Sequence, residues 1–131
     1  MAIFCSTEVM RAALDLIATS VSRIVLGDAT IAASATNAES TAVSGIASAT
    51  VSGTSFTLAD SSVTGKKITV AAQATLTVDS TKVAAYVYLI STGATGTIYY
   101  RTSCATRAFT STADRVTIPA WDIHFYEGTV V

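Results

Sequence analysis

The side chains best suited to chemistry lie in one stretch near the C-terminus, IPAWDIHFYEG (118–128), which holds the chain's single proline, tryptophan and histidine. Asp122 and His124 are two residues apart in this stretch. If the stretch is a strand, both side chains share one face, because successive side chains alternate between faces. A carboxylate beside an imidazole can orient it as a general base or as a metal ligand. The pair is therefore the first candidate for a catalytic or metal-binding site.

The other parts that such a site needs are missing from the sequence. Nucleophilic catalysis also needs a positioned serine, cysteine or threonine and an oxyanion site built from a turn, and the chain has no G-x-S-x-G motif. Zinc needs three or four ligands, whereas no Cys-x-x-Cys or clustered Cys/His spacing occurs. We therefore predict a non-enzymatic protein with no metal and no cofactor. We interpret Asp122 and His124 as part of a polar strand face that meets solvent or a neighbouring subunit.

The composition indicates a protein that functions within an assembly. Of the 131 residues, 50% are hydrophobic and 13% are charged, and the formal net charge is −1. Free monomers usually stay soluble through surface charge, so a surface with few charges suits a chain packed against neighbours. The near-neutral charge argues against nucleic-acid binding. We see no signal-peptide pattern and no apolar run long enough for a membrane-spanning helix.

Two cysteines, Cys5 and Cys104, are far apart in the sequence. One disulfide between them is possible, but small disulfide scaffolds use more cysteines than this. Two buried free thiols are the simpler interpretation.

The N-terminal segment STEVMRAALDLIATSV (6–21) predicts the one helix. An apolar stripe recurs in it at helical spacing: Val9, Ala13, Leu16, Ile17 and Val21. We expect this stripe to dock on the chain's own domain or on a partner. Ser6 or Thr7 can cap the helix, and β-branched residues accumulate after Thr19, where we expect it to end.

From about Ser22 onward the pattern predicts strands. The clearest is KKITVAAQATLTVDS (66–80), in which apolar and polar residues alternate as in a strand with one wet face. VAAYVYLI (83–90) is apolar in both phases and predicts a central strand covered on both faces. TIYYRTSCATRAF (97–109) predicts one long strand, or two strands joined by a bend near Ser103.

The final strand changes its side-chain alternation at Pro119 and Ala120. The apolar residues occupy even positions before the proline and odd positions after it: Val116, Ile118, Trp121, Ile123 and Phe125. A slip of one residue turns every following side chain to the other face unless a bulge absorbs it. Proline is tolerated at bulges because it cannot donate to a ladder. We therefore predict a kink at this point.

About eight strands, turn signals at regular spacing and the lack of βαβ alternation predict the fold class. We expect a mainly β protein with a single antiparallel β-sandwich, jelly-roll-like, and one short N-terminal helix. The chain is then a single domain, with residues 1–21 as the helical arm and residues 22–131 as the sandwich. No internal repeat and no linker divides it.

The C-terminal half resembles a family of short structural proteins of tailed bacteriophages and prophages. The similar segment is AAYVYLISTGATGTIYYRTSCATRAFTSTADRVTIPAWDI (84–123), and its most specific part is the final V-x-I-P-A-W-D-I strand. The family pattern usually continues with an acidic residue, where this chain has His124. The N-terminal STEVMRAALDLI (6–17) is similar to the short helix that opens related phage proteins.

The resemblance implies a virion component. We expect a head decoration (cement) protein that binds the outer capsid surface as an oligomer, often a trimer, and stabilises the shell. The expected partners are the major capsid protein and other copies of the chain, without nucleic acid or membrane. The expected location is the virion, assembled in the cytoplasm of the bacterial host. A tail-associated receptor- or glycan-binding module is the alternative, and a small β-fold enzyme is a third class.

The interface residues that we predict lie at the two ends of the chain, which readily reach neighbouring subunits. They are Ile3, Phe4, Trp121, Asp122, His124, Tyr126, Val130 and Val131. The tryptophan has two interpretations, a core residue or an interface anchor. Four tyrosines also have two interpretations, a glycan-binding platform or half-buried cross-strand pairs; they are Tyr86, Tyr88, Tyr99 and Tyr100.

Overall fold

The computed structural model describes residues 6–28, 46–60, 65–78, 80–91 and 97–126. Within these residues the chain forms an α-helix, α1 (Thr7–Ser20), a short 3-10 helix, η1 (Gly53–Ser55), and nine strands. The strands are β1 (Arg23–Gly27), β2 (Ala47–Thr50), β3 (Phe56–Asp60), β4 (Gly65–Val70), β5 (Gln73–Val78), β6 (Val83–Ile90), β7 (Ile98–Ala108), β8 (Val116–Ile118) and β9 (Trp121–Tyr126). The predicted mainly β fold with one N-terminal helix is confirmed.

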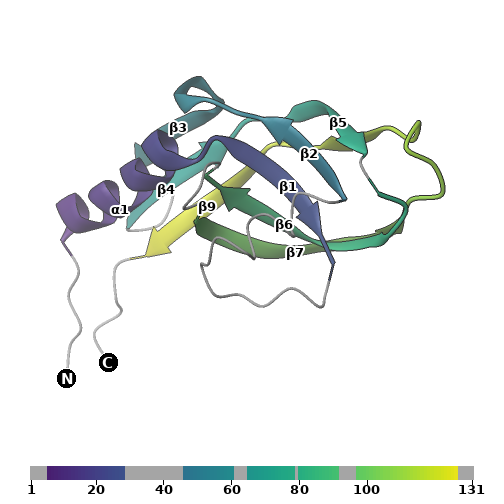
Figure 1. The fold of residues 1–131 in the computed structure, drawn as a ribbon. Coiled ribbons are helices and arrows are strands. Elements are labelled where there is room, and N and C mark those ends of the chain that lie inside the picture. The colour runs from purple at the N-terminus through teal and green to yellow at the C-terminus, as the bar shows by residue number, and fades with distance from the viewer. Residues whose placement is uncertain (1–5, 29–45, 61–64, 79, 92–96, 127–131) are drawn as a thin grey trace, which may run out of the picture.

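The strands form two antiparallel sheets that curl into a half-barrel (Figure 1). The larger sheet has six strands in the order β7-β6-β1-β2-β5-β8, and the smaller has three in the order β3-β4-β9. The apolar core lies between the two sheets and α1. This sandwich-like arrangement agrees with the fold class that the strand pattern predicted.

Strands continue from one sheet into the other at a corner of the half-barrel. The prediction of one continuous strand over 66–80 is wrong. This segment is divided into β4 and β5, which belong to different sheets. The exposed Ala71 and Ala72 separate them. β8 and β9 are divided in the same way at Pro119 and Ala120. Since β4 pairs with β9 and β5 pairs with β8, the two divisions form one corner.

The corner explains the change in side-chain alternation at Pro119. Ile118 in β8 and Ile123 in β9 are both buried, although a regular strand would turn residues five apart to opposite faces. Because the chain changes sheet between them, both side chains can reach the same core. Proline has no N–H to donate. Because Pro119 lies between the two ladders, neither sheet loses a hydrogen bond there. The predicted kink is confirmed, and it is a change of sheet.

α1 begins where the sequence predicted and covers the three-stranded sheet. Ser6 is the N-cap, and its Oγ accepts a hydrogen bond from the backbone N–H of Val9 at 3.2 Å. The helix ends at Ser20, one residue beyond the predicted end. It packs against β3, β4 and η1.

The predicted apolar stripe of α1 is buried in its own domain only in part. The buried residues of the helix and its C-cap are Met10, Leu14, Ile17, Ala18 and Val21. Val9 and Leu16 are instead 59% and 54% exposed, and Ala13 is exposed as well. Both sets recur at helical spacing, so periodicity allowed two stripes, and the contact with β3 and β4 selected one of them.

β6 is a central strand with both faces buried, as predicted. Val87 and Leu89 belong to the main core, whereas Tyr88 and Ile90 belong to a second apolar cluster on the opposite face. None of the four is more than 5% exposed. Gly27 of β1 lies against the Tyr88 ring, where an added Cβ would come within 2.3 Å of a ring carbon.

β7 is one strand of 11 residues rather than two. Its register with β6 is irregular, because Ala84 lies opposite Arg107 and Tyr86 lies opposite Ser103. Extra residues of β7 therefore bulge between Ser103 and Arg107. The bend that the sequence suggested near Ser103 is this bulge.

Candidate functional site

The predicted interface residues are described only in part. Trp121, Asp122 and His124 lie in β9, one of the two edge strands of the three-stranded sheet, and Tyr126 is the last residue of that strand. The four others lie outside the described residues: Ile3, Phe4, Val130 and Val131. The candidate site is therefore the polar face of β9 and of its neighbour β4.

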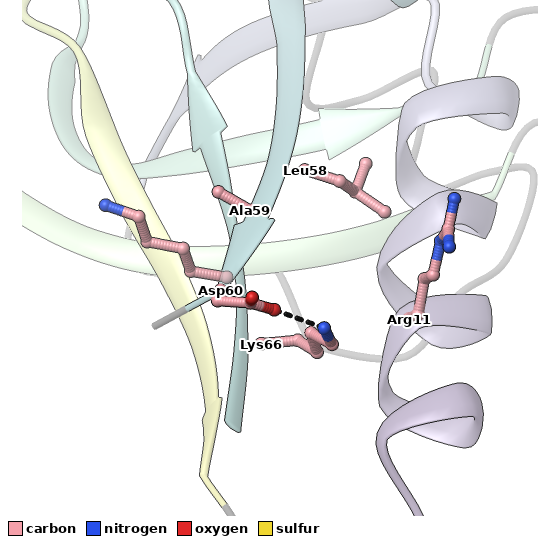
Figure 2. Close-up of a pocket in the computed structure, with 6 residues that line it drawn as sticks. Arg11, Leu58, Ala59, Asp60 and Lys66 are labelled. Atoms are coloured by element: carbon pink, nitrogen blue, oxygen red, sulfur yellow. Dashed lines mark hydrogen bonds and ion pairs between the residues drawn. The ribbon is translucent and has the colours of Figure 1, made fainter. Parts of the chain in front are cut away.

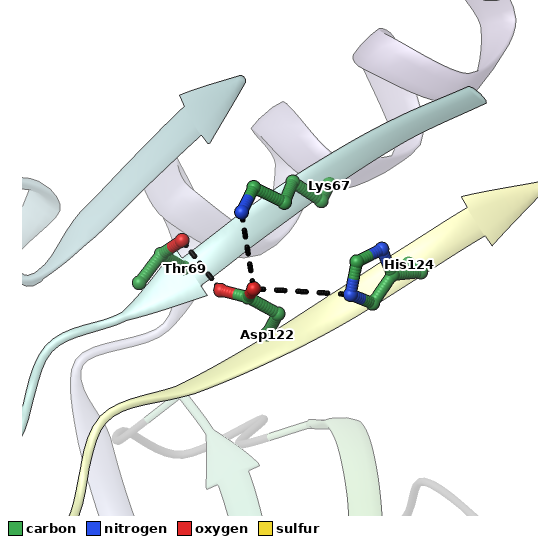
Figure 3. Close-up of polar contacts among 4 residues, drawn as sticks. All are labelled: Lys67, Thr69, Asp122 and His124. Carbon is green, nitrogen blue, oxygen red and sulfur yellow. Dashed lines mark hydrogen bonds and ion pairs between the residues drawn. The ribbon is translucent and has the colours of Figure 1, made fainter. Parts of the chain in front are cut away.

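Asp122 is the centre of a small polar cluster on this face (Figure 3). Thr69 of β4 lies directly opposite it, and the Thr69 hydroxyl donates a hydrogen bond to Asp122 Oδ1 at 2.6 Å. The ammonium of Lys67, two residues earlier on β4, donates to Asp122 Oδ2 at 3.1 Å. His124 lies opposite Lys67, and its Nε2 is 3.8 Å from the same carboxylate oxygen. Strand pairing thus brings together side chains more than fifty residues apart in the sequence.

These contacts hold Asp122 in its charged form. The Thr69 hydroxyl lowers the pKa of the carboxyl most, followed by the hydrogen bond from Lys67, while desolvation opposes them. Charge attraction from Lys67 and His124 adds to the lowering. Both side chains of the Lys67–Asp122 pair stay partly exposed, at 28% and 32%. The carboxylate is therefore an ionised, already paired surface group, a poor general base near neutral pH.

The cluster does not have the arrangement of a catalytic dyad. The 3.8 Å between His124 and Asp122 is longer than a hydrogen bond that would fix an imidazole in one orientation. The Thr69 hydroxyl donates to the carboxylate and is not directed at the imidazole. Among the described residues, no group of three or more His, Cys, Asp or Glu side chains could hold a metal ion. The geometry is that of the polar strand face which we favoured from the sequence.

Trp121 is half-buried and packs against the main core. It lies opposite Val70 of β4, and its indole Nε1 is enclosed without a hydrogen-bond acceptor among the described residues. Of the two interpretations offered by the sequence, this position agrees with a core residue.

The four tyrosines do not form one platform. Tyr88 is fully buried, and Tyr86 packs with it in the second apolar cluster. Tyr99 and Tyr100 pack instead against the main core. The guanidinium of Arg101 lies over the Tyr86 ring, 5.0 Å from its centroid. This division agrees with structural packing rather than with a glycan-binding surface.

A hollow of about 230 Å³ lies between α1 and the β3–β4 hairpin (Figure 2). Arg11 reaches it from α1, and Leu58 and an ion pair between Lys66 and Asp60 line its other side. The hydrogen bond and the charge of Lys66 lower the pKa of the Asp60 carboxyl. Because the ion pair already occupies both of these charges, we assign no ligand to the hollow.

Two surface features involve residues outside the set of predicted interface residues. One is the outward apolar stripe of α1, which includes Val9 and Leu16. Its spacing was visible in the sequence, which left open whether the stripe docks on the chain's own domain or on a partner. The other is an apolar groove between β7 and β8, for which the sequence held no signal, because the groove depends on the order of strands in the sheet. Cys104 lines this groove as a free, half-buried thiol, and Cys5 lies outside the described residues.

Within the described part of the chain, no helix has both the length and the apolar character needed to cross a membrane. Comparisons with protein-family models, with curated proteins and with solved structures found no match to this chain.

Proposed function

We propose that this chain is a non-enzymatic structural protein of a tailed-bacteriophage particle. In this proposal it is a head decoration protein that binds the outer capsid surface as an oligomer and stabilises the shell. The phage assignment is supported by the resemblance of residues 84–123 to short phage structural proteins. Only 13% of the residues are charged, which supports a role within an assembly.

The observation that carries the docking role is the outward stripe of α1. Val9 and Leu16 lie seven residues apart on one side of the helix, with the exposed Ala13 between them, and more than half of each large side chain is exposed. Phe125 is 41% exposed, and the end of β9 that carries it lies at the same end of the molecule as the start of α1 (Figure 1). An outward row of exposed apolar side chains on one helix favours a contact with another protein.

The expected energy of such a contact is modest for one copy and large for a shell. Fully burying a valine or leucine side chain is worth about 1.5–3 kcal/mol, and much of that gain offsets the entropy lost on association. Oligomerisation presents several copies of the α1 stripe at once, so their contacts add without independent entropic costs. Capsid symmetry then repeats the contact over the whole surface.

The test is reconstitution on capsids that lack the protein. The Val9→Ser/Leu16→Ser variant is expected to fold, because both side chains are exposed, yet to bind these capsids at least tenfold more weakly than the wild type. Val83→Ser is the matched control, since Val83 is also exposed, at 48%, but lies on β6. Equal binding by all three proteins would remove the α1 stripe from the interface.

Cryo-electron microscopy of the virion tests the location. Density for this chain on the head is the expected result. Density on the tail alone would favour the tail-associated module over the decoration protein.

A further inference from the structure

β9 is an edge strand that carries apolar side chains on its inner face. Among the described residues it pairs only with β4, and α1 packs on β3 and β4. Trp121 and Phe125 share the inner face with the buried Ile123, because residues two apart on a strand point the same way. Trp121 is nevertheless only half-buried, and Phe125 is 41% exposed. The described residues therefore leave the inner face of this edge incompletely covered.

The outer face of the same edge carries an acidic and a basic side chain. Asp122 and His124 lie two residues apart on it, beside Lys67 and Thr69 of β4 (Figure 3). Charged side chains on an edge strand discourage pairing with most other strands. A strand with opposite charges two residues apart is, however, complementary to a reversed copy of itself, because reversal inverts the order of the charges. The edge thus disfavours most strands but fits β9 of a second copy of the chain.

One antiparallel register of two β9 strands satisfies both charges. A two-fold axis through Ile123 places Asp122 opposite His124 of the second copy, twice, and Trp121 opposite Phe125. Unlike charges and aromatic pairs in such cross-strand positions stabilise a sheet. A shift of two residues places Asp122 opposite Asp122, or His124 opposite His124, and like charges there are destabilising. A shift of one residue would exchange the inner and outer faces.

Asp122 can accept this additional contact without losing its present ones. Its Oδ1 accepts a hydrogen bond from Thr69 at 2.6 Å, and its Oδ2 accepts one from Lys67 at 3.1 Å. A carboxylate offers about four acceptor positions, and 32% of this side chain is exposed. The hydrogen bonds from Thr69 and Lys67 lower the pKa of the carboxyl. The negative charge is therefore already formed and held in place at the edge.

We propose that β9 is a dimerisation edge, which pairs antiparallel with β9 of a second copy about a two-fold axis at Ile123. The two small sheets then form one continuous sheet in the order β3-β4-β9-β9-β4-β3. The pairing places Phe125 against Trp121 of the second copy on the inner face and joins unlike charges on the outer face. It gives the predicted interface residues Trp121, Asp122 and His124 one partner, a second copy of this chain.

The dimer leaves the α1 stripe accessible. Its two-fold axis is perpendicular to the sheet, so both α1 helices lie on the same face. They pack on β3 and β4, and the two β4 strands are three ladder steps apart, roughly 14 Å. Directly packed helices are about 8–10 Å apart, so the two helices do not cover each other's stripes. The dimer does not depend on capsid binding, and a dimer that fails to bind capsids would overturn the decoration function alone.

Size-exclusion chromatography with light scattering tests the dimer at about pH 6, where an ordinary imidazole is largely protonated. With rising concentration the wild type should reach twice the 13.5 kDa mass of one chain. Asp122→Lys and His124→Asp should each dimerise at least tenfold more weakly, because each sets like charges opposite each other twice. A mixture of the two variants should regain the dimer. The introduced lysine then faces the introduced aspartate, and the unchanged His124 faces the unchanged Asp122.

Asp15→Lys is the matched control, because it makes the same change of charge at an exposed position of α1. This variant should dimerise like the wild type. Far-ultraviolet circular dichroism checks that all three variants keep the β fold, and regained dimerisation in the mixture shows it independently for two of them.

The same masses contain the outcomes that contradict the proposal. A wild type that stays monomeric at every concentration, or that forms a trimer, would overturn the two-fold pairing. Folded variants that stay monomeric when mixed would overturn the register that joins Asp122 to His124. Undiminished dimerisation of each variant alone would remove β9 from the interface.

Discussion

The two sheets differ in what lies on their outer faces. The large sheet buries apolar side chains there as well as in the core: Tyr88 and Ile90 of β6 are almost completely enclosed. The small sheet has a wet outer face, on which Asp122 is held by Lys67 and Thr69. Both sheets share the same core on their inner faces.

This difference separates stability from surface function. Buried area on both faces concentrates stabilising contacts in the large sheet, because each apolar side chain removed from water contributes roughly in proportion to its area. The outer face of the small sheet contributes little, because partly exposed ion pairs are screened by solvent. Substitutions on that face, and on the outward stripe of α1, can therefore change contacts with other proteins while the fold persists.

The largest expected effect comes from the core of the large sheet. Leu89→Ala should lower the free energy of unfolding by about 2–5 kcal/mol, because it removes a fully buried side chain and leaves a cavity. The same substitution at Leu58, half-buried on the edge strand β3 of the small sheet, should cost clearly less. Urea unfolding of both variants measures the difference. Equal costs would contradict the assignment of stability to the large sheet.

Gly27→Ala tests the close packing on the outer face of the large sheet. The added methyl group would meet the Tyr88 ring, and relieving that overlap should cost about 1–3 kcal/mol of unfolding free energy. Gly53→Ala is the matched control, because the nearest atom to its added Cβ is the Ala18 carbonyl oxygen at 3.7 Å, an ordinary contact. Thermal or urea unfolding should show that Gly27→Ala is the less stable variant. A larger loss of stability in Gly53→Ala would contradict this account.

Ser6→Ala tests the helix that covers the small sheet. Loss of the hydroxyl leaves the Val9 N–H without its cap, and such changes cost about 1 kcal/mol. Thr19→Ala is the control, because the Thr19 hydroxyl donates to the Asp15 carbonyl from an exposed position and caps no free N–H. Thr19→Ala should change the free energy of unfolding by no more than about 0.5 kcal/mol in the same measurement. An equal loss in both variants would argue against the capping role.

The smallest effect is the pH dependence of the wet face. The pKa of Asp122 lies below its ordinary value of 3.8, so its contribution to stability is present above that value and disappears as the pH falls through the folded pKa. The stability difference between the wild type and Asp122→Asn should therefore shrink below pH 3.8. A difference that grows on acidification would contradict the sign.

The same carboxyl can be followed directly by NMR titration. Thr69→Val removes the hydroxyl that lowers the pKa of Asp122 most, so this pKa should rise. The pKa of Asp114, which is lowered by the backbone N–H groups of Thr110 and Ser111, should stay where it is. If Asp122 does not respond, Lys67 rather than Thr69 controls its ionisation.

Local patterns predicted the elements well. The cap at Ser6, the central position of residues 83–90 and the kink at Pro119 were all visible in the sequence, because each depends on spacing within one element. Asp122 and His124 were also placed correctly on one face by alternation along a strand. The predictions for both chain ends, which lie outside the described residues, stay predictions.

The predictions that failed needed information about distant partners. Two stripes of α1 satisfied the helical period, and only the packing on β3 and β4 decided that Leu14 is buried and Leu16 is exposed. Alternation over 66–80 continued through Ala71 and Ala72, so nothing local marked the passage from one sheet to the other.

By itself, the sequence determined the strand character, the start of the helix and the two faces of each strand, since these follow from side chains a few residues apart. The tertiary structure alone decided that Asp122 is paired by Lys67 and Thr69 from a strand more than fifty residues away. It also decided that β7 and β8 end one sheet with a groove between them. Strand order and pairing depend on which distant segments close against each other around the shared core, and no local spacing specifies that choice.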